Sequence, residues 1–231
     1  MLKSEPVYES AKADAARTRK PGKTARRTQT ERSEDTRLRL VEAAAKILHR
    51  KGYAGLRTAE VSRVAKVSRG GQLHHFPTKD SLVIAAAEHI LKRSSELGRR
   101  RAVEVAASDD AIEAIIQDAI DFFFSDDFVT ILDLVLSGSK NANIRDRVYA
   151  SARTYRLPVE SAWIDVLVKR GLPGADAEKV LWVTVSVVRG LALRALWQKD
   201  EALFRSVLDA TKAMLLCHWD SVLKSKRGGK K

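Results

Sequence analysis

The sequence predicts an all-α fold, on the basis of two observations. Apolar residues recur at intervals of three and four through most of the chain from Asp35 onward, which is the period of a helix with one buried face. Residue types that begin or end helices, such as Ser, Thr, Gly and Pro, stand at the edges of these periodic segments. We find no convincing strand pattern and no internal repeat. Helices packed on helices are therefore expected.

Composition excludes several classes of protein. A chain of 231 residues that is 45% hydrophobic and 31% charged has the balance of a globular protein with a real core. No stretch approaches the roughly 18 to 20 uncharged apolar residues of a membrane span, and the N-terminus lacks the apolar centre of a secretory signal. Cys217 is the only cysteine, so neither an internal disulfide nor a zinc site is expected. These features predict a cytoplasmic protein without a metal or cofactor.

The net charge of +13 is unevenly distributed along the chain. Residues 36–80 contain ten Lys and Arg against three Asp and Glu, whereas residues 81–223 contain eighteen against twenty. A basic segment joined to a large, nearly neutral one favours a domain that binds a polyanion, attached to a domain with another task.

The first elements are a basic arm and a long helix. Residues 1–33 lack apolar periodicity and mix Lys and Arg with Thr, Gly and Pro, which predicts a disordered arm. The arm either keeps the protein in solution or contacts the phosphates or minor groove of a nucleic acid. A helix follows from about Asp35 and ends at Gly52, a residue type that commonly terminates helices.

Three further helices are expected before residue 93. Thr58 is expected to cap a helix over residues 59–65, and Ser68 to cap a third that runs to about Phe76. Pro77 cannot continue that helix, and Thr78 caps a fourth. A short helix, a tight turn and a polar helix make a helix-turn-helix, whose second helix enters the major groove of DNA. Residues 34–93 are therefore predicted to be a DNA-binding domain.

Residues 36–93 resemble the DNA-binding domain of the tetracycline-repressor (TetR) family of bacterial regulators. The matching segments, in consecutive and correctly spaced order, are A-A-A-K-I-L-H-R-K-G-Y from Ala43, T-A-E-V-S-R-V-A-K-V-S from Thr58 and H-H-F-P-T-K-D-S-L from His74. The resemblance implies a homodimeric transcription regulator whose C-terminal helices enclose a small-molecule pocket and form the dimer interface.

The chain departs from the family's pattern at two positions. Lys66 stands in the turn where Gly or a similarly permissive residue is usual, which costs about 1 kcal/mol if that position needs a positive φ. Leu73 stands where Tyr is common, so a hydroxyl that would contact a phosphate is missing.

The rest of the chain is predicted to be a helical domain for effector binding and dimerisation over residues 94–223. Apolar periodicity predicts helices over 109–124, 128–136, 143–170, 175–197 and 200–223. Pro158 is expected to kink or break the third of these helices. Residues 224–231 form a basic tail.

The third helix of the head is expected to contact DNA. Arg can pair with guanine and Gln with adenine, so Arg69, Gln72 and His74 are candidates for base contacts from its exposed side. Gly70 and Gly71 each weaken a helix by about 1 kcal/mol relative to Ala, which a close approach of DNA would explain. The alternative is a poorly formed helix end with solvated side chains. Free N–H groups at helix starts and the charge of a nearby lysine attract phosphates. Further contacts with DNA, chiefly with its phosphates, are therefore predicted for Thr58, Ser68, His75 and Lys79.

Two weaker sets of residues are predicted in the C-terminal domain. Candidates for the wall of an effector pocket are Phe124, Phe128, Trp163 and Trp182, although aromatics at helical spacing are more often core. Candidates for the dimer interface, which could equally lie inside one subunit, are Val185, Val188, Leu191, Leu208, Met214 and Leu215.

The favoured hypothesis is a repressor that binds a palindromic DNA operator as a homodimer and releases it when a small-molecule effector binds. The alternative is a constitutive or architectural DNA-binding protein without an effector, which binds independently of sequence through its basic arms. An enzyme is not expected, because the sequence contains no nucleophile–base set, Gly-rich phosphate loop or paired-carboxylate motif.

Overall fold

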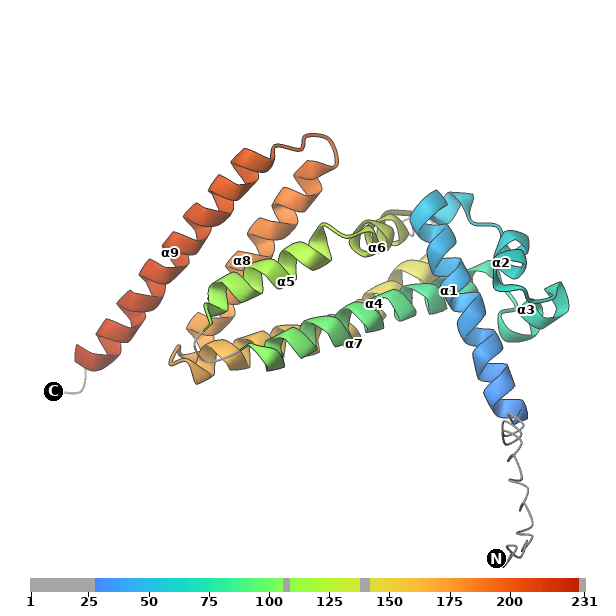
Figure 1. Ribbon diagram of the computed structural model, residues 1–231, viewed down its shortest axis with the longest axis horizontal. Coiled ribbons are helices and arrows are strands. Elements are labelled where there is room, and N and C mark those ends of the chain that lie inside the picture. Colours follow the sequence, from blue (N-terminus) through green and yellow to red (C-terminus); the bar gives the residue numbers. More distant parts are fainter. Residues whose placement is uncertain (1–27, 106–108, 138–141, 229–231) are drawn as a thin grey trace, which may run out of the picture.

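The computed structural model describes residues 28–105, 109–137 and 142–228, and these residues form nine α-helices without a strand (Figure 1). The all-α prediction is confirmed. The helices are α1 (Gln29–Gly55), α2 (Thr58–Ala65), α3 (Arg69–His75), α4 (Lys79–Glu104), α5 (Ala111–Phe123), α6 (Asp126–Ser137), α7 (Ala142–Lys169), α8 (Gly174–Ala195) and α9 (Glu201–Gly228). Within these ranges, no helix is long and apolar enough to cross a membrane.

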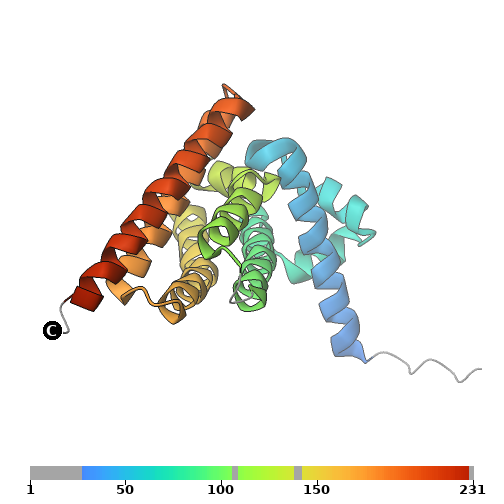
Figure 2. The same ribbon diagram turned by 60° about the vertical axis from the view of Figure 1, so that its left-hand side comes forward.

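The long helices α4 and α7 run side by side through the middle of the molecule (Figures 1 and 2). Helices α1, α2 and α3, which we call the head, lie at one end, and α8 and α9 lie at the other. One hydrophobic core joins α1, α2 and α4 to residues of α6 and α7, and a second joins the end of α4 to α5, α7, α8 and α9. Because α4 continues unbroken across residues 93 and 94, the predicted domain boundary falls inside a helix that belongs to both cores.

The first helix begins earlier than predicted. The Thr28 side chain accepts a hydrogen bond from the Glu31 N–H, and the Glu31 carboxylate accepts one from the Thr28 N–H, at 3.2 and 2.7 Å. This reciprocal pair is a capping box, which satisfies two backbone donors at a helix start. The predicted arm is therefore helical over residues 29–33, and its remainder, residues 1–27, lies outside the described residues. At Gly52, the predicted helix end, the backbone turns out of the helix with φ 62°.

Two predictions for the C-terminal helices need correction. Helix α7 continues through Pro158, so of the two predicted outcomes, a kink or a break, the break is wrong. Pro158 is exposed, as is Thr154, whose carbonyl the proline leaves without its usual donor, so water can satisfy that carbonyl. Helix α9 continues to Gly228 instead of ending at residue 223, so part of the predicted tail is helical.

Candidate DNA-binding interface

The turn between α2 and α3 depends on a strained lysine. Lys66 has φ 54° and ψ 44°, the left-handed conformation that favours glycine. Its N–H donates to the Arg63 carbonyl at 3.2 Å, and the Val67 N–H donates to the Ser62 carbonyl at 3.0 Å. These hydrogen bonds close the end of α2. The positive φ shows that the backbone strain expected at Lys66 is present.

The predicted helix caps are confirmed at two positions and wrong at one. The Ser68 hydroxyl accepts from the Gly71 N–H at 3.1 Å and begins α3, and Thr78 caps α4. Thr58 does not cap α2, because the preceding residue, Arg57, holds the N-cap position without a side-chain bond. Thr58 is instead the first helical residue.

The expectation that Gln72 lies on the exposed side of α3 is wrong. Its side chain is only 3% exposed, and Nε2 donates to the Phe76 carbonyl at 2.7 Å. Phe76 is also buried, in the core that joins the head to α6 and α7. Gln72 therefore holds the end of α3 against the core and cannot reach a base edge.

The exposed face of α3 contains Arg69, Gly70, Leu73 and His74. His75 is half-buried, and burial lowers the pKa of its ring, with repulsion from His74 and Arg37 acting in the same direction. A lowered pKa keeps this imidazole neutral at pH 7. Arg69 and His74 thus remain, of the predicted base-contacting side chains, the two that point outward.

The Lys79 side chain is partly buried and packs against Tyr53 at the end of α1. Its Nζ donates to the Tyr53 carbonyl at 2.8 Å and lies 4.2 Å from the centre of the Tyr53 ring. Burial lowers the pKa of Lys79, and the charge of Arg57 lowers it further, whereas Asp80 opposes the change. The first residue of α4 is thereby held against the end of α1.

Two carboxylates of α6 hold the head from the C-terminal side. Asp133 accepts from the Tyr53 N–H at 2.8 Å, directly after the break at Gly52. A Cβ on Gly52 would lie 2.9 Å from Asp133 Oδ2, and the left-handed φ of 62° also disfavours a side chain there. Asp127 accepts two bonds from Arg93 of α4 at 2.9 and 3.0 Å, and its Oδ1 lies 2.9 Å from His49 Nε2 of α1.

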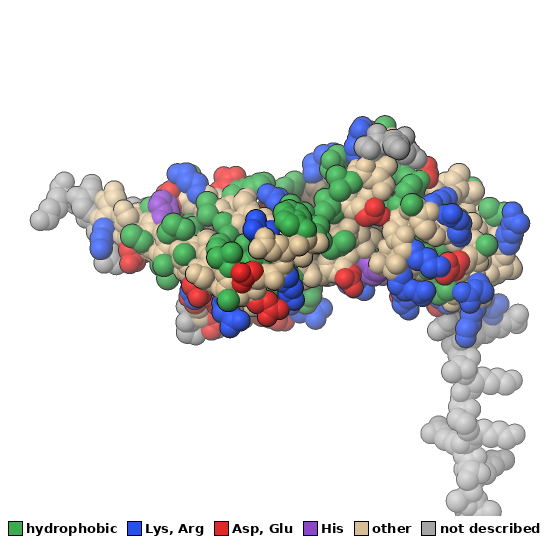
Figure 3. Space-filling model, turned by 90° about the horizontal axis from the view of Figure 1, so that it is seen from above, with side chains coloured by type: hydrophobic (Ala, Val, Ile, Leu, Met, Phe, Trp, Pro, Cys, Tyr) green, Lys and Arg blue, Asp and Glu red, His purple; other side chains and the backbone are tan. Residues whose placement is uncertain are grey.

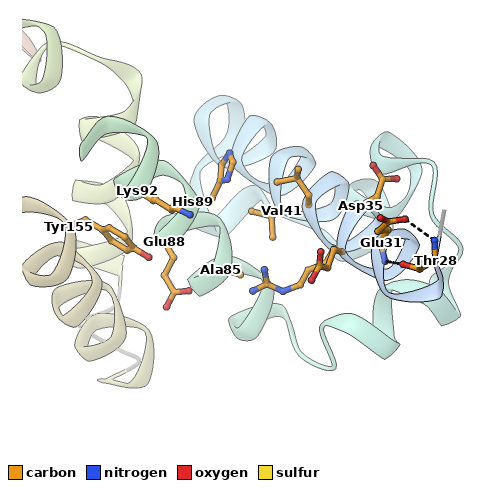
Figure 4. Close-up of a pocket in the computed structure, with 12 residues that line it drawn as sticks. Thr28, Glu31, Asp35, Val41, Ala85, Glu88, His89, Lys92 and Tyr155 are labelled. Atoms are coloured by element: carbon orange, nitrogen blue, oxygen red, sulfur yellow. Dashed lines mark hydrogen bonds between the residues drawn. The ribbon is translucent and has the colours of Figure 1, made fainter. Parts of the chain in front are cut away.

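A groove of about 950 Å³ lies between the first half of α1 and the facing side of α4 and α7 (Figure 4). Glu31 and Asp35 of α1 lie at one end of it, and Tyr155 and Lys92 at the other. The capping bonds of Thr28 and Glu31 are drawn there as dashed lines. Its lining mixes both signs of charge, and the sequence patterns gave no sign of this groove.

The head is the basic part of the surface. Lys and Arg side chains gather over it in Figure 3, whereas hydrophobic side chains spread over the C-terminal helices. This distribution matches the excess of basic residues in 36–80 and provides the positive field that attracts DNA phosphates.

A cluster of charged side chains lies inside the C-terminal domain, where the sequence predicted none. Asp118 of α5 is buried, and it accepts from Trp163 Nε1 at 3.0 Å and from Arg101 at 3.3 Å. The Arg156 guanidinium lies 4.1 Å from the centre of the Phe122 ring, and burial lowers its pKa while Asp118 and Glu160 oppose that change. A hollow of about 30 Å³ lies between these groups. In the described ranges, this cluster included, no group of three His, Cys, Asp or Glu could hold a metal ion.

The four residues predicted to line an effector pocket lie in different surroundings. Trp163 is buried in the second core, and Phe128 packs edge-to-face on its neighbours Phe122 and Phe123. Phe124 lies beside a shallow hollow of about 210 Å³ next to α9, and Trp182 is 47% exposed on α8. The structure does not bring these four aromatics together.

Most of the residues predicted for the dimer interface are buried in, or pack against, the core of their own subunit. Val185, Val188 and Leu215 are buried in the core of their own subunit, and Leu208 packs against that core. Leu191 is half-buried, and Met214 is fully on the outer face at 65% exposed. The exposed large apolar residues of α8 and α9 are Trp182, Val183, Leu203, Met214 and Leu216.

A short helix joined by a tight turn to a second helix that exposes Arg and His from a basic head defines a helix-turn-helix DNA-binding protein. Residues 40–86 match the model of bacterial regulatory proteins of the tetR family. The chain is 43% identical over 186 residues to the HTH-type transcriptional regulator CymR of Pseudomonas putida, a match that covers 80% of this chain and 92% of CymR. The chain belongs to the tetR family, whose members are transcription regulators and not enzymes.

Solved structures of the family share the fold. A TetR-family regulator from Mesorhizobium loti superposes with a TM-score of 0.65 at 16% identity, covering 80% of this chain and 97% of that one. FadR of Bacillus subtilis, solved in complex with stearoyl-CoA, gives a TM-score of 0.52 at 17% identity, covering 75% and 96%. At these identities the likeness concerns the fold alone.

Proposed function

We propose that the protein is a repressor that acts in the cytoplasm, binds a palindromic operator as a homodimer, and releases it when a small molecule binds the C-terminal domain. The observation that supports this most is the exposed face of α3, where Arg69 and His74 point outward from a basic head. Thr58, Ser68 and Lys79 lie at nearby helix starts, where N–H groups attract phosphates. The Lys79 ammonium group would donate to a phosphate with the N–H groups that are not bonded to the Tyr53 carbonyl.

A mobility-shift assay on the promoter beside the protein's own gene tests this function. A complex that withstands a large excess of random DNA is expected, with a footprint containing two half-sites about one helical turn apart. Arg69→Ala should weaken specific binding by about tenfold or more, because a good base contact contributes about 1–3 kcal/mol. Binding no tighter than to random DNA would instead support the architectural alternative.

The outer face of α8 and α9 is proposed to form the dimer interface. Exposed apolar residues recur along both helices, and in Figure 2 the two helices lie together along one edge of the molecule. A large exposed apolar surface of this kind is typical of a protein–protein interface. Sedimentation equilibrium should show a dimer for the wild-type protein and a monomer for Met214→Asp. Val103→Asp, at an apolar position of α4 that is 82% exposed against 65% for Met214, is the control and should stay dimeric.

The effector is proposed to bind between α4, α5 and α7, beside Asp118 and Arg156, where the hollow of about 30 Å³ has to widen to admit it. Buried charges are costly in an apolar core, and such clusters with shifted pKa values are concentrated at functional sites. That FadR was solved in complex with stearoyl-CoA supports a small-molecule ligand for this chain. A panel of small molecules should contain one that raises the melting temperature and releases the operator. Arg156→Ala should abolish both effects, whereas Arg153→Ala, on the exposed side of α7, should keep them.

A further inference from the structure

Two residues on the exposed face of α3 are of types that neither solvent exposure nor packing inside the protein explains. Gly70 and Leu73 are three positions apart, so they lie on the same side of the helix, next to Arg69 and His74. This side of α3 points away from Gln72 and Phe76, which face the core.

Gly70 has no reason inside the chain to be glycine. A Cβ built at this position would meet nothing within 4 Å, whereas a Cβ on Gly71 would lie 3.1 Å from Val67 Cγ1. The backbone of Gly70 is helical, so it needs no left-handed conformation. A glycine in a helix weakens it relative to alanine. The open space at Gly70 therefore fits a close approach from outside the molecule.

Leu73 is an apolar side chain at the centre of this face. It is 46% exposed, and it projects beside Gly70 from the most basic segment of the chain. A leucine cannot hydrogen-bond a phosphate or a base edge. In the major groove, the apolar group that distinguishes one base from the others is the C5 methyl of thymine.

We propose that Leu73 is a specificity-determining residue that contacts a thymine methyl in each half-site, and that Gly70 lets the base-pair edge approach the helix closely. This inference rests on the proposed function, in which α3 is the helix that enters the major groove. It also assigns an apolar contact to the position where the family commonly has a tyrosine.

Replacing thymine by deoxyuracil tests the contact, because uracil lacks only the C5 methyl. Within the protected operator, each thymine is replaced in turn in one half-site, and affinity is measured by fluorescence anisotropy. At one thymine of the half-site, replacement by deoxyuracil should lower the affinity of the protein for the operator about fourfold, which corresponds to the burial of one methyl-sized group. Replacing it in both half-sites should lose about fifteenfold.

Variants of the protein identify the side chain responsible. Leu73→Ala should bind the thymine and uracil operators equally, and His74→Ala should still distinguish them. Both positions are exposed, so both variants should melt as the wild type does. A uracil effect that persists in Leu73→Ala, or no thymine at which uracil matters, would overturn the contact. If no protected operator exists, the proposed function fails rather than this inference.

Gly70→Ala tests the close approach. Alanine is the better helix former, so the variant should melt at the same or a higher temperature. Its affinity for the operator should nevertheless fall about tenfold or more, because the added methyl occupies the space that the base-pair edge needs. Unchanged affinity would overturn this part of the proposal.

Discussion

Replacing Gln72 by methionine separates a structural role from base recognition. Methionine has a similar length and fills the same space, but it cannot donate the hydrogen bond that Nε2 gives to the Phe76 carbonyl at 2.7 Å. Pro77 follows Phe76, and Gln72 is buried, so the carbonyl that loses this donor lies where water has little access. A buried acceptor left unsatisfied costs about 1–3 kcal/mol. In a chain of this size each kcal/mol lowers the Tm by about 2–4 °C.

Urea denaturation and operator binding are measured on the same preparations at one protein concentration. Gln72→Met should unfold at a lower urea concentration, while its order of preference among operators with single base-pair changes stays that of the wild type. His74→Ala, an exposed neighbour, should change stability by less than about 0.5 kcal/mol. The reasoning is refuted if Gln72→Met keeps the wild-type stability and loses its preference at one A·T pair, because Gln72 would then read adenine.

Three further predictions concern the turn, the contact between α6 and the head, and the acid stability. Lys66→Gly should stabilise the fold by about 0.5–1 kcal/mol, because relief of about 1–2 kcal/mol of left-handed strain exceeds the entropic cost of glycine; an unchanged urea midpoint would show no strain. Asp133→Ala should destabilise the fold by about 1–3 kcal/mol in urea, since the Tyr53 N–H loses its acceptor, and Asp133→Asn should retain most of the stability; equal losses would contradict this. Burial raises the pKa of Asp110, but the hydrogen bonds from Lys212 and two backbone N–H groups outweigh it and lower the pKa overall. The ionised Asp110 carboxylate therefore adds stability above about pH 3.9, and this stability is lost as the pH falls. In an acid titration followed by circular dichroism, Lys212→Met should begin to unfold at a higher pH than the wild type. An identical acid midpoint for the two proteins would count against this prediction.

The helices of the head could be predicted from sequence because each has a local signal. Ser68, Pro77 and Thr78 mark the limits of α3 and the start of α4, and the structure has them in those roles. The start of α1 was missed because Thr28 and Glu31 cap it within a polar segment that has no apolar period. The boundary predicted at residue 93 lies inside α4, and a helix that passes between two cores has no sequence signal where one core gives way to the next.

Which face of α8 is buried could not be predicted, because that helix is apolar almost all round. Hydrophobic periodicity predicts which face of a helix is buried only when the opposite face is polar. Val188 and Trp182 have similar hydrophobic character, yet Val188 is buried in the second core and Trp182 is exposed. The charged cluster around Asp118 was missed for a related reason, because its members come from three helices that are distant in sequence.

Helix α3 shows why polarity alone does not predict which side chains are exposed. On the rule that polar residues point outward, Gln72 should face solvent and Leu73 the core, and the structure has the reverse. The orientation of a seven-residue helix is set by its ends: Ser68 fixes the start, and Phe76 is pulled into the core. With those ends fixed, the helical period places Gln72, four residues before Phe76, on the inner side, where its amide can satisfy the Phe76 carbonyl. The same period places Leu73 beside Gly70 and His74, on the exposed side, which we propose faces DNA. The exposed face of this helix therefore follows from the anchoring of its two ends, and the chemistry of each residue acts only within that constraint.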